Sequence, residues 1–451
     1  MAQPTIRRVA IVGGVRTPFC RSNTLYGDLT NLDLMITALQ GLADRYNLNG
    51  VHIDEVVGGA VVTHSKDWNI AREAVIGTKL APSTPGITMI QACGTSLQAA
   101  MGIAAKIAIG EIDCGIAMGS DTTSDAPVVF RRQFAQRLAT ANRGRGTGDK
   151  LKAFKGFTPG ELTPQAPSVG EPRTGLSMGE HCELMAKEWH IARADQDRLA
   201  YESHKKAAKA YDEGYMDDLL VPCAGVFRDN NLRPDIELEK IATLKPAFDK
   251  SEAGTLTAAN STPLTDGAAA VLLASEEWAD KRGLPVLAYL THAQHAALDF
   301  VAGEGLLMAP TIAVSKLLGR AGLTLQDFDF YEIHEAFAAQ VLATLKAWES
   351  EDYCRAKLGR AQAMGAIDPA RMNVKGSSLA VGHPFAATGA RITANLAKLL
   401  SQPGGPGVRP GVRRGLISIC TAGGMGVAAI LEHSNGRQAP ALNAPAPATA
   451  A

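Results

Sequence analysis

The sequence has no excess of charge of either sign and no long apolar run. Its 451 residues include 45 basic and 45 acidic side chains, so no overall field favours binding to nucleic acid. No segment reaches the roughly 20 uninterrupted apolar residues of a membrane span. The first residues lack the apolar core of a signal peptide and pass directly into a strand-like run. We therefore expect a cytoplasmic protein without a membrane span.

Cysteine and aromatic residues are also scarce. The seven cysteines are odd in number, widely scattered and without the paired spacing of metal ligands, which argues against a disulfide framework and a zinc site. Aromatic residues make up 5% of the chain, whereas hydrophobic residues make up 46% and glycine occurs 45 times. This composition suits an α/β protein with tight turns, and the length suggests two or three domains.

Short apolar runs alternate with segments of helical spacing in the first and last parts of the chain. Strands are expected at residues 9–14, 56–62, 87–93, 113–119, 286–290, 328–333 and 415–420, with 427–432 pairing back on the last of them. Helices are expected at residues 30–46, 68–80, 94–109, 311–322 and 389–400, and after His334. Such alternation predicts a mostly parallel sheet with helices on both faces.

The two ends of the chain resemble each other. A strand-like run ends at Cys93 and another ends near His383, and a helix of small residues follows each one. We infer two similar α/β halves separated by an insertion. The expected units are an N-terminal half of residues 1–120 and 251–280, an inserted loop domain of 121–250, a C-terminal half of 281–435, and a disordered low-complexity tail of 436–451.

The insertion contains a strongly basic segment. Residues 130–157 carry eight basic side chains and one acidic side chain. One interpretation is a solvated loop, and the other is a basic surface that meets a phosphate-bearing ligand or an anionic membrane surface. Further along, Ser177 is a possible N-cap of a helix, and residues 194–197 are expected to cap a long helix that ends at Ala210.

Four reactive side chains stand beside glycines or at expected helix starts: Cys93, His334, His383 and Cys420. A thiol at a helix start lies among unpaired backbone N–H groups and at the positive end of the helix dipole, which favour the thiolate and lower the pKa. Each residue alone also has an ordinary interpretation as a buried core residue. A Cys/His zinc site is a rival interpretation, although the sequence contains no close pair of ligands.

Together, two thiols and two imidazoles suit carbon–carbon bond chemistry on thioesters. Cys93 would accept an acyl group with His383 as its general base, and Cys420 would move a second proton. Backbone N–H groups near Cys93 and in the turn after Cys420 would bind one oxyanion. The imidazoles of His334 and His383 would bind another.

Several segments with these residues resemble the signatures of the thiolase family. The segments are residues 9–19, 91–99 around Cys93, 260–270, His-Glu-Ala-Phe-Ala at 334–338, Asn-Val-Lys-Gly-Ser-Ser-Leu-Ala-Val-Gly-His-Pro at 373–384, and Cys-Thr-Ala-Gly-Gly-Met-Gly at 420–426. The resemblance runs in order over about residues 5 to 433. It implies a five-layered αβαβα fold, an inserted loop domain that covers coenzyme A, and a homodimer or homotetramer.

Carried over position by position, the resemblance gives Cys93 the role of acyl-accepting nucleophile, His383 that of its activator and Cys420 that of the second acid and base. At the position of His334 the family more commonly has an asparagine, which holds a water for the oxyanion. The histidine form resembles the branch with the thiolase subunits of fatty-acid oxidation multienzyme complexes, so a hydratase/dehydrogenase subunit is a further partner to consider.

Two further departures and five contact residues follow from the same resemblance. Ala422 and Ser377 stand where the family commonly has glycine, and the backbone N–H groups of Ala422 and Cys93 are expected at the oxyanion. The residues expected to line the pantetheine channel are Met178, Ala258, Thr262, Ala336 and Phe337.

The resemblance implies an acyltransferase with a ping-pong mechanism and no metal or redox cofactor. It would cleave a 3-ketoacyl-CoA with CoA, or condense acetyl-CoA in reverse, through an acyl-cysteine. Two alternatives stand beside it: a ketoacyl-synthase-type condensing enzyme, and a non-catalytic carrier of acyl-CoA or lipid with the same fold. The second thiol, Cys420, argues against the first alternative, and the intact reactive set argues against the second.

Overall fold

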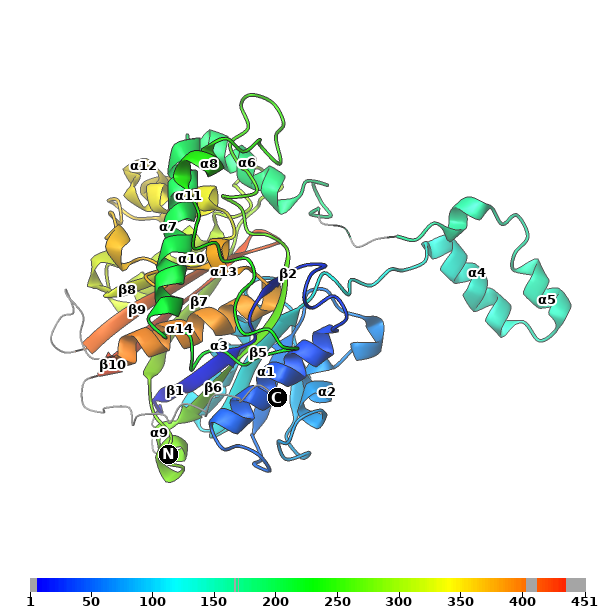
Figure 1. Cartoon of the computed structure of the whole chain (residues 1–451), viewed down its shortest axis with the longest axis horizontal. Coiled ribbons are helices and arrows are strands. Elements are labelled where there is room, and N and C mark those ends of the chain that lie inside the picture. Colours follow the sequence, from blue (N-terminus) through cyan, green and yellow to red (C-terminus); the bar gives the residue numbers. More distant parts are fainter. Residues whose placement is uncertain (1–5, 166–167, 169, 403–411, 435–451) are drawn as a thin grey trace.

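The computed structural model describes residues 6–165, 168, 170–402 and 412–434 (Figure 1). The tail expected at 436–451 lies outside these residues. Within the described residues, ten strands form one mixed sheet in the order β4-β3-β5-β6-β1-β7-β10-β9-β8, with β2 paired to β6. The strands are β1 (Val9–Arg16), β2 (Cys20–Arg21), β3 (Glu55–Gly59), β4 (Gly86–Thr88), β5 (Cys114–Asp121), β6 (Thr265–Ser275), β7 (Ala288–Ala297), β8 (Phe330–Ile333), β9 (Val412–Thr421) and β10 (Met425–Ser434).

The prediction of a mostly parallel sheet is wrong. Of the nine strand pairings in the described part of the chain, only β3–β4, β3–β5 and β8–β9 are parallel. Strand β6 follows the long insertion and returns antiparallel to β5. Strands β9 and β10 are joined by a tight turn at residues 422–424, which only antiparallel neighbours allow.

The helices mostly begin and end where the sequence indicated. They are α1 (Asn31–Arg45), α2 (Ile70–Ile76), α3 (Thr95–Ile109), α4 (Arg132–Arg143), α5 (Thr147–Lys152), α6 (Met178–Glu188), α7 (Arg193–Asp212), α8 (Leu238–Ala242), α9 (Glu276–Lys281), α10 (Ala309–Ala321), α11 (Ala338–Glu349), α12 (Glu351–Leu358), α13 (Ser378–Val381) and α14 (Thr388–Ser401). Ser177 caps α6 through a capping box, as predicted. Helix α7 instead starts after Ala192, which makes no side-chain cap bond, so the cap expected at 194–197 is wrong.

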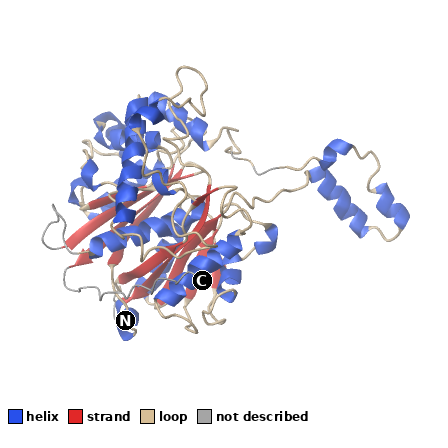
Figure 2. Ribbon diagram, viewed as in Figure 1, coloured by secondary structure: helices blue, strands red, loops and turns tan. Residues whose placement is uncertain are grey.

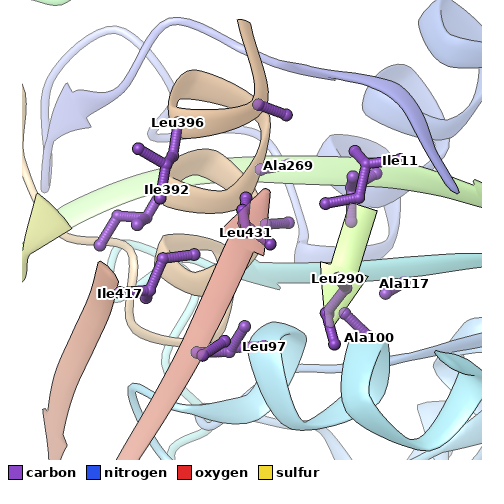
Figure 3. Close-up of a cluster of buried hydrophobic side chains, with 14 of the residues drawn as sticks. Ile11, Leu97, Ala100, Ala117, Ala269, Leu290, Ile392, Leu396, Ile417 and Leu431 are labelled. Carbon is purple, nitrogen blue, oxygen red and sulfur yellow. The ribbon is translucent and has the colours of Figure 1, made fainter. Parts of the chain in front are cut away.

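Helices lie at the centre and on both outer faces, and strands lie between them, which gives the five layers that the resemblance implied (Figure 2). The inner helices α3 and α14 pack between the inward faces of the two ends of the sheet. Helices α1 and α2 cover the outer face of the N-terminal strands, and α10 and α11 cover the outer face of the C-terminal strands. Figure 3 shows this centre, where Leu97 of α3 and Ile392 of α14 lie with Ile11, Ile417 and neighbouring side chains.

The two halves share one topology. The order β3-β5-β6-β1 in the first half corresponds to β8-β9-β10-β7 in the second, and in each only the first of the three pairings is parallel. Helix α3 directly precedes β5 and α14 directly precedes β9, so these two central helices are equivalent. The inference of two similar halves is therefore confirmed, whereas the domain boundaries given above stay predictions.

Helices α4 and α5 stand away from the body of the molecule (Figure 1). The interpretation of residues 130–157 as a loop is wrong, because two helices form there around the rings of Phe130, Phe134, Phe154 and Phe157. Arg137 is held by Glu161 at 2.6 Å, and the other seven basic side chains of the segment are exposed. We call residues 130–164, which contain α4 and α5, the helical projection.

One stretch among the described residues, which ends with helix α3, has the length and composition of a membrane span. The stretch Ala92–Ile109 meets that test, and 56% of it is buried. Its buried side chains lie in the central layer between the two ends of the sheet, which is the position of a core helix.

Candidate active site

Cys93 lies in a tight turn between β4 and α3. Its neighbour Ala92 has a left-handed φ of 46°, and the hydroxyl of Thr95 accepts the N–H of Gln91 and donates to the carbonyl of Ala92, both at 2.8 Å. Gly94 is the N-cap of α3 and has no room for a side chain, because a Cβ would lie 2.7 Å from Val427. Cys93 thus precedes the helix rather than lying in its first turn, and β10 closes over it.

His383 lies in the equivalent place before α14. The strand expected to end there is wrong, because residues 378–381 form the short helix α13. Gly382 follows with a φ of 103°, and a Cβ on it would lie 2.7 Å from Thr265. The backbone N–H of His383 donates to the Thr265 hydroxyl at 2.7 Å. These contacts bring His383 Nε2 to 3.0 Å from Cys93 Sγ and its Nδ1 to 2.6 Å from the Thr388 hydroxyl.

His334 follows directly after β8 and is fully buried. Its ring centroid lies 4.2 Å from that of His383, with the planes inclined at 50°. Its Nδ1 lies 3.0 Å from the Ser378 hydroxyl, and its Nε2 has no hydrogen-bond partner among the described residues. The helix predicted to start here begins later, at Ala338, so His334 is in an extended segment.

Cys420 lies near the end of β9 and is 1% exposed. It packs in an apolar cluster with Ala336 and Phe337. Burial raises the pKa of its thiol well above the usual value, and the charges of Cys93 and Cys182 raise it further. The structure therefore brings the second thiol close enough to Cys93 for their charges to interact.

The zinc interpretation does not fit the geometry of the closest pair. One donor atom each of Cys93, His334 and His383 lies within 4.8 Å of the others, so three ligands are at hand. A tetrahedral zinc would hold a sulfur and a nitrogen about 3.5 Å apart, given its usual bond lengths. The observed separation of 3.0 Å between Cys93 Sγ and His383 Nε2 is shorter and suits a direct hydrogen bond.

Burial controls the protonation of the reactive pair. It raises the pKa of Cys93 to about 12, although hydrogen bonds from the backbone N–H groups of Ala422 and of Cys93 itself lower it. Burial, and then the charge of Arg391, lowers the pKa of His383 to about 3. The expectation of a lowered thiol pKa is therefore wrong, because loss of water outweighs the helix start. At neutral pH both groups are uncharged, and the thiol donates to Nε2.

The turn after Cys420 directs a backbone N–H toward the sulfur of Cys93. Gly423 and Gly424 have φ of 77° and 69°, which favour glycine, and they turn the chain so that the Ala422 N–H acts on Cys93. The Gly423 N–H is held at 2.8 Å by the buried carboxylate of Glu171, which comes from the insertion. Sequence reasoning missed Glu171, and no local pattern marks it.

Four of the five residues expected at the pantetheine channel lie together. Met178, Ala336 and Phe337 share a cluster with Phe248, and Thr262 donates its hydroxyl to the carbonyl of Ala336 at 3.0 Å. The fifth, Ala258, is exposed in the loop before Asn260. Sequence reasoning also missed several buried polar residues around the two imidazoles: Thr265, Glu335, Ser378, Thr388 and Arg391.

Comparisons with known proteins agree over nearly the whole chain. The family models "Thiolase, N-terminal domain" and "Thiolase, C-terminal domain" match residues 9–277 and 284–433. The 3-ketoacyl-CoA thiolases of Yersinia pestis (strain Pestoides F) and Yersinia pseudotuberculosis serotype O:3 (strain YPIII) are each 43% identical over 432 residues, covering 94% of this chain and 97% of the relative.

Solved structures of similar proteins have the same fold. The Bacillus anthracis acetyl-CoA acetyltransferase has a TM-score of 0.77 and 29% identity, covering 95% of this chain and 100% of its own. The human mitochondrial 3-ketoacyl-CoA thiolase in complex with CoA has a TM-score of 0.76 and 28% identity, covering 95% of this chain and 99% of its own.

Proposed function

Because this chain belongs to the thiolase family, we propose that its buried pair of Cys93 and His383 carries the acyl group during exchange between coenzyme A thioesters. The enzyme is an acyltransferase that cleaves a 3-ketoacyl-CoA with CoA, or condenses acetyl-CoA in reverse. The observation that carries the residue assignment is the 3.0 Å contact between Cys93 Sγ and His383 Nε2. This contact supports His383 as the general base, because it could take the thiol proton directly as Cys93 attacks.

In the cleavage direction, His383 Nε2 takes the thiol proton as Cys93 attacks the 3-keto carbon. The bond between C2 and C3 then breaks, its electron pair stays on C2, and the Cys420 thiol protonates that carbon to give acetyl-CoA. In the second half, CoA gives its thiol proton to the Cys420 thiolate and attacks the acyl carbon. Cys93 leaves and recovers its proton from His383, so every proton returns to its starting group.

Two sets of donors serve the oxygens that become negative. The N–H groups of Cys93 and Ala422 already act on the reactive sulfur, which supports their role toward the oxygen of the carbon bound to Cys93. The unpartnered Nε2 of His334, beside His383, supports a second donor site for the thioester oxygen of the enolate. An uncharged imidazole donates a hydrogen bond there without adding a buried charge.

The proposal extends to partners and setting. The inserted segment 121–250 covers CoA, whose pantetheine arm passes Met178, Ala258, Thr262, Ala336 and Phe337. CoA complexes of the Ascaris suum thiolase and the human mitochondrial 3-ketoacyl-CoA thiolase support CoA binding. The enzyme acts in fatty-acid oxidation as a cytoplasmic homodimer or homotetramer, with a hydratase/dehydrogenase subunit as a further partner and no cofactor. The name of the Yersinia relatives supports the degradative role.

Intact-mass and peptide spectrometry after mixing with acetyl-CoA tests the assignment. We expect one acetyl group on Cys93, removed by free CoA, and no adduct in the Cys93→Ala variant. The Cys420→Ser variant serves as the matched control. It should still be acetylated, more slowly because Cys420 protonates the departing CoA, but it should not condense two acetyl groups. A ketoacyl-synthase mechanism would leave condensation intact in that variant. A carrier would give no adduct, and an adduct on another residue would overturn the role of Cys93.

A further inference from the structure

Ser378 and Arg391 form a buried hydrogen-bonded relay to Nδ1 of His334, on the other side of the ring from the unpartnered Nε2. The Ser378 hydroxyl lies 3.0 Å from His334 Nδ1 and accepts a hydrogen bond of 2.7 Å from Arg391 Nη2. The serine is fully buried and the arginine is 7% exposed. The three side chains come from the end of β8, from α13 and from α14.

The relay fixes the position of the imidazole proton. A guanidinium has donors and no acceptor, so Ser378 Oγ must accept from Arg391. The serine proton is then left with one acceptor among its described partners, which is His334 Nδ1. The reverse arrangement would leave a buried hydroxyl proton without an acceptor, which costs about 1–3 kcal/mol. Nδ1 is therefore the acceptor, and the neutral ring carries its proton on Nε2.

We propose that Ser378, held by Arg391, is a positioning residue that keeps His334 in the tautomer with a proton on Nε2, facing the reacting thioester. This role rests on the proposed function, in which that N–H stabilises the enolate oxygen. Ser378 does not touch substrate; it acts through His334. Without it, Nδ1 can hold the proton, and Nε2 becomes an acceptor that repels an oxyanion.

The neighbouring contacts hold both ends of the relay in place. Asn373 pairs with both backbone groups of Ile333, the residue before His334, at 2.9 and 2.8 Å. Glu335, the residue after His334, accepts from the backbone N–H of Leu379 at 3.3 Å, next to Ser378. Burial, and then the charges of His383 and Arg391, also keeps the pKa of His334 well below the usual value, so the ring stays neutral.

The adjacent serine offers a matched control. Ser377 is equally buried and its hydroxyl also accepts from Arg391, at 3.3 Å, but no contact joins it to His334 among the described residues. Loss of its hydroxyl removes a similar buried group beside the same arginine. A general loss of packing would affect both positions, whereas a tautomer effect would appear only at Ser378.

The experiment compares two half-reactions in S378A, S378T and S377A. Exchange of deuterium from the solvent into the methyl group of acetyl-CoA needs the enolate and should fall about 10- to 100-fold in S378A, somewhat less than for loss of a whole oxyanion donor. Acetylation of Cys93 should stay within about threefold. S378T, which keeps a hydroxyl, should recover most of the exchange, and S377A should stay within about threefold of wild type in both steps.

A double-mutant cycle separates positioning from a structural role. If Ser378 acts through His334, adding S378A to H334A should change the exchange rate by less than about threefold, whereas H334A alone lowers it by roughly 10²-fold. Nitrogen-15 NMR of histidine-labelled wild-type protein gives a reading that depends on no variant. At pH 7 the His334 signals should correspond to a protonated Nε2 and an unprotonated Nδ1.

The outcomes are distinguishable. A protonated Nδ1 in wild type, additive costs in the cycle, or equal loss of acetylation and exchange in S378A would overturn the positioning role while the enzyme still acetylates Cys93. Absence of the acetyl adduct on wild-type Cys93 would instead overturn the proposed function, and the role of Ser378 with it.

Discussion

The thiol of Cys93 and the imidazole of His383 share one proton in a site that bulk water barely reaches. The two residues are 7% and 5% exposed. Transfer of the thiol proton to the imidazole would create a buried thiolate and a buried imidazolium. In such a buried site, the free-energy cost of these two charges exceeds the stabilisation from the N–H donors near the sulfur. We therefore expect the proton to move from Cys93 to His383 only as the sulfur attacks the substrate. At that moment the negative charge passes to the carbonyl oxygen, where hydrogen-bond donors stabilise it.

The pH dependence of thiol alkylation tests this neutral resting pair. Because the pKa of Cys93 is raised to about 12, its thiolate fraction is small at pH 7 and grows about tenfold with each unit of pH. We expect the rate of Cys93 labelling by iodoacetamide, followed by peptide mass spectrometry, to keep rising from pH 7 to 10. The Cys93→Ala variant measures labelling of the other cysteines. A plateau below pH 8 would indicate a preformed thiolate–imidazolium pair instead.

At the scale of single residues, the sequence was sufficient for groups with their own chemistry. The contact of Cys93 with His383, and of His383 with His334, was expected, and the structure has both. Ser378 and Glu171 were not foreseen, because their positions depend on partners 44 and 252 residues away in the chain. A buried serine or glutamate has no local signature that separates a positioning role from ordinary polar packing.

At the scale of elements, most strands and helices were predicted from the sequence, but the short helix before His383 and the directions of the strands were not. A strand was expected to end near His383, yet residues 378–381 form one helical turn. The decision is tertiary, since Gly382 must turn the chain against Thr265. The mixed direction of the sheet likewise depends on the return of β6 after the insertion, which no local pattern indicates.

The helical projection is the element whose removal should leave catalysis intact. Its aromatic rings pack on one another, and its base closes where Gln165 N–H donates to the Val129 carbonyl at 2.8 Å. Replacing residues 130–164 by an Asn-Gly turn should therefore preserve the fold. We expect Cys93 acetylation and the KM for CoA to stay within about threefold in steady-state assays.

The same excision tests the two binding roles predicted for the basic side chains against a surface that is only solvated. A tenfold or larger rise in the KM for CoA would show that they meet the phosphates of that ligand. Sedimentation with anionic vesicles tests the other role, because a membrane-binding surface would be lost with the excised segment while catalysis continues. Neutral vesicles are the control, since attraction between exposed basic residues and anionic lipid needs the lipid charge.

At the scale of the whole molecule, the site exists because two equivalent helices meet at the centre. Cys93 precedes α3 and His383 precedes α14, and the two helices occupy equivalent places in the two halves. Ser96 on α3 joins them by accepting the backbone N–H of Ala390 at 2.8 Å and donating to the Ala386 carbonyl at 2.5 Å. The distance between nucleophile and base is thus set by how closely these helices pack.

Gly389 on α14 closely approaches the backbone of α3 and provides the test of this coupling. A Cβ on Gly389 would lie 2.3 Å from the backbone N of Leu97, so Gly389→Ala must push α14 away from α3. Overpacking of this kind costs about 1–3 kcal/mol, and a shift near 1 Å between reacting groups costs about 10²-fold in rate. We expect a lower melting temperature by calorimetry and slower Cys93 acetylation by about that factor.

Gly102 lies on α3 itself, is exposed, and has nothing within 4 Å of an added Cβ, which makes Gly102→Ala the matched control. That change should stabilise the helix by about 0.5–1 kcal/mol and leave acetylation unchanged. If Gly389→Ala instead acetylates at the wild-type rate while melting lower, the packing of the two halves would support the fold without setting the reactive geometry. The proximity of Cys93 and His383 would then have to come from their own loops.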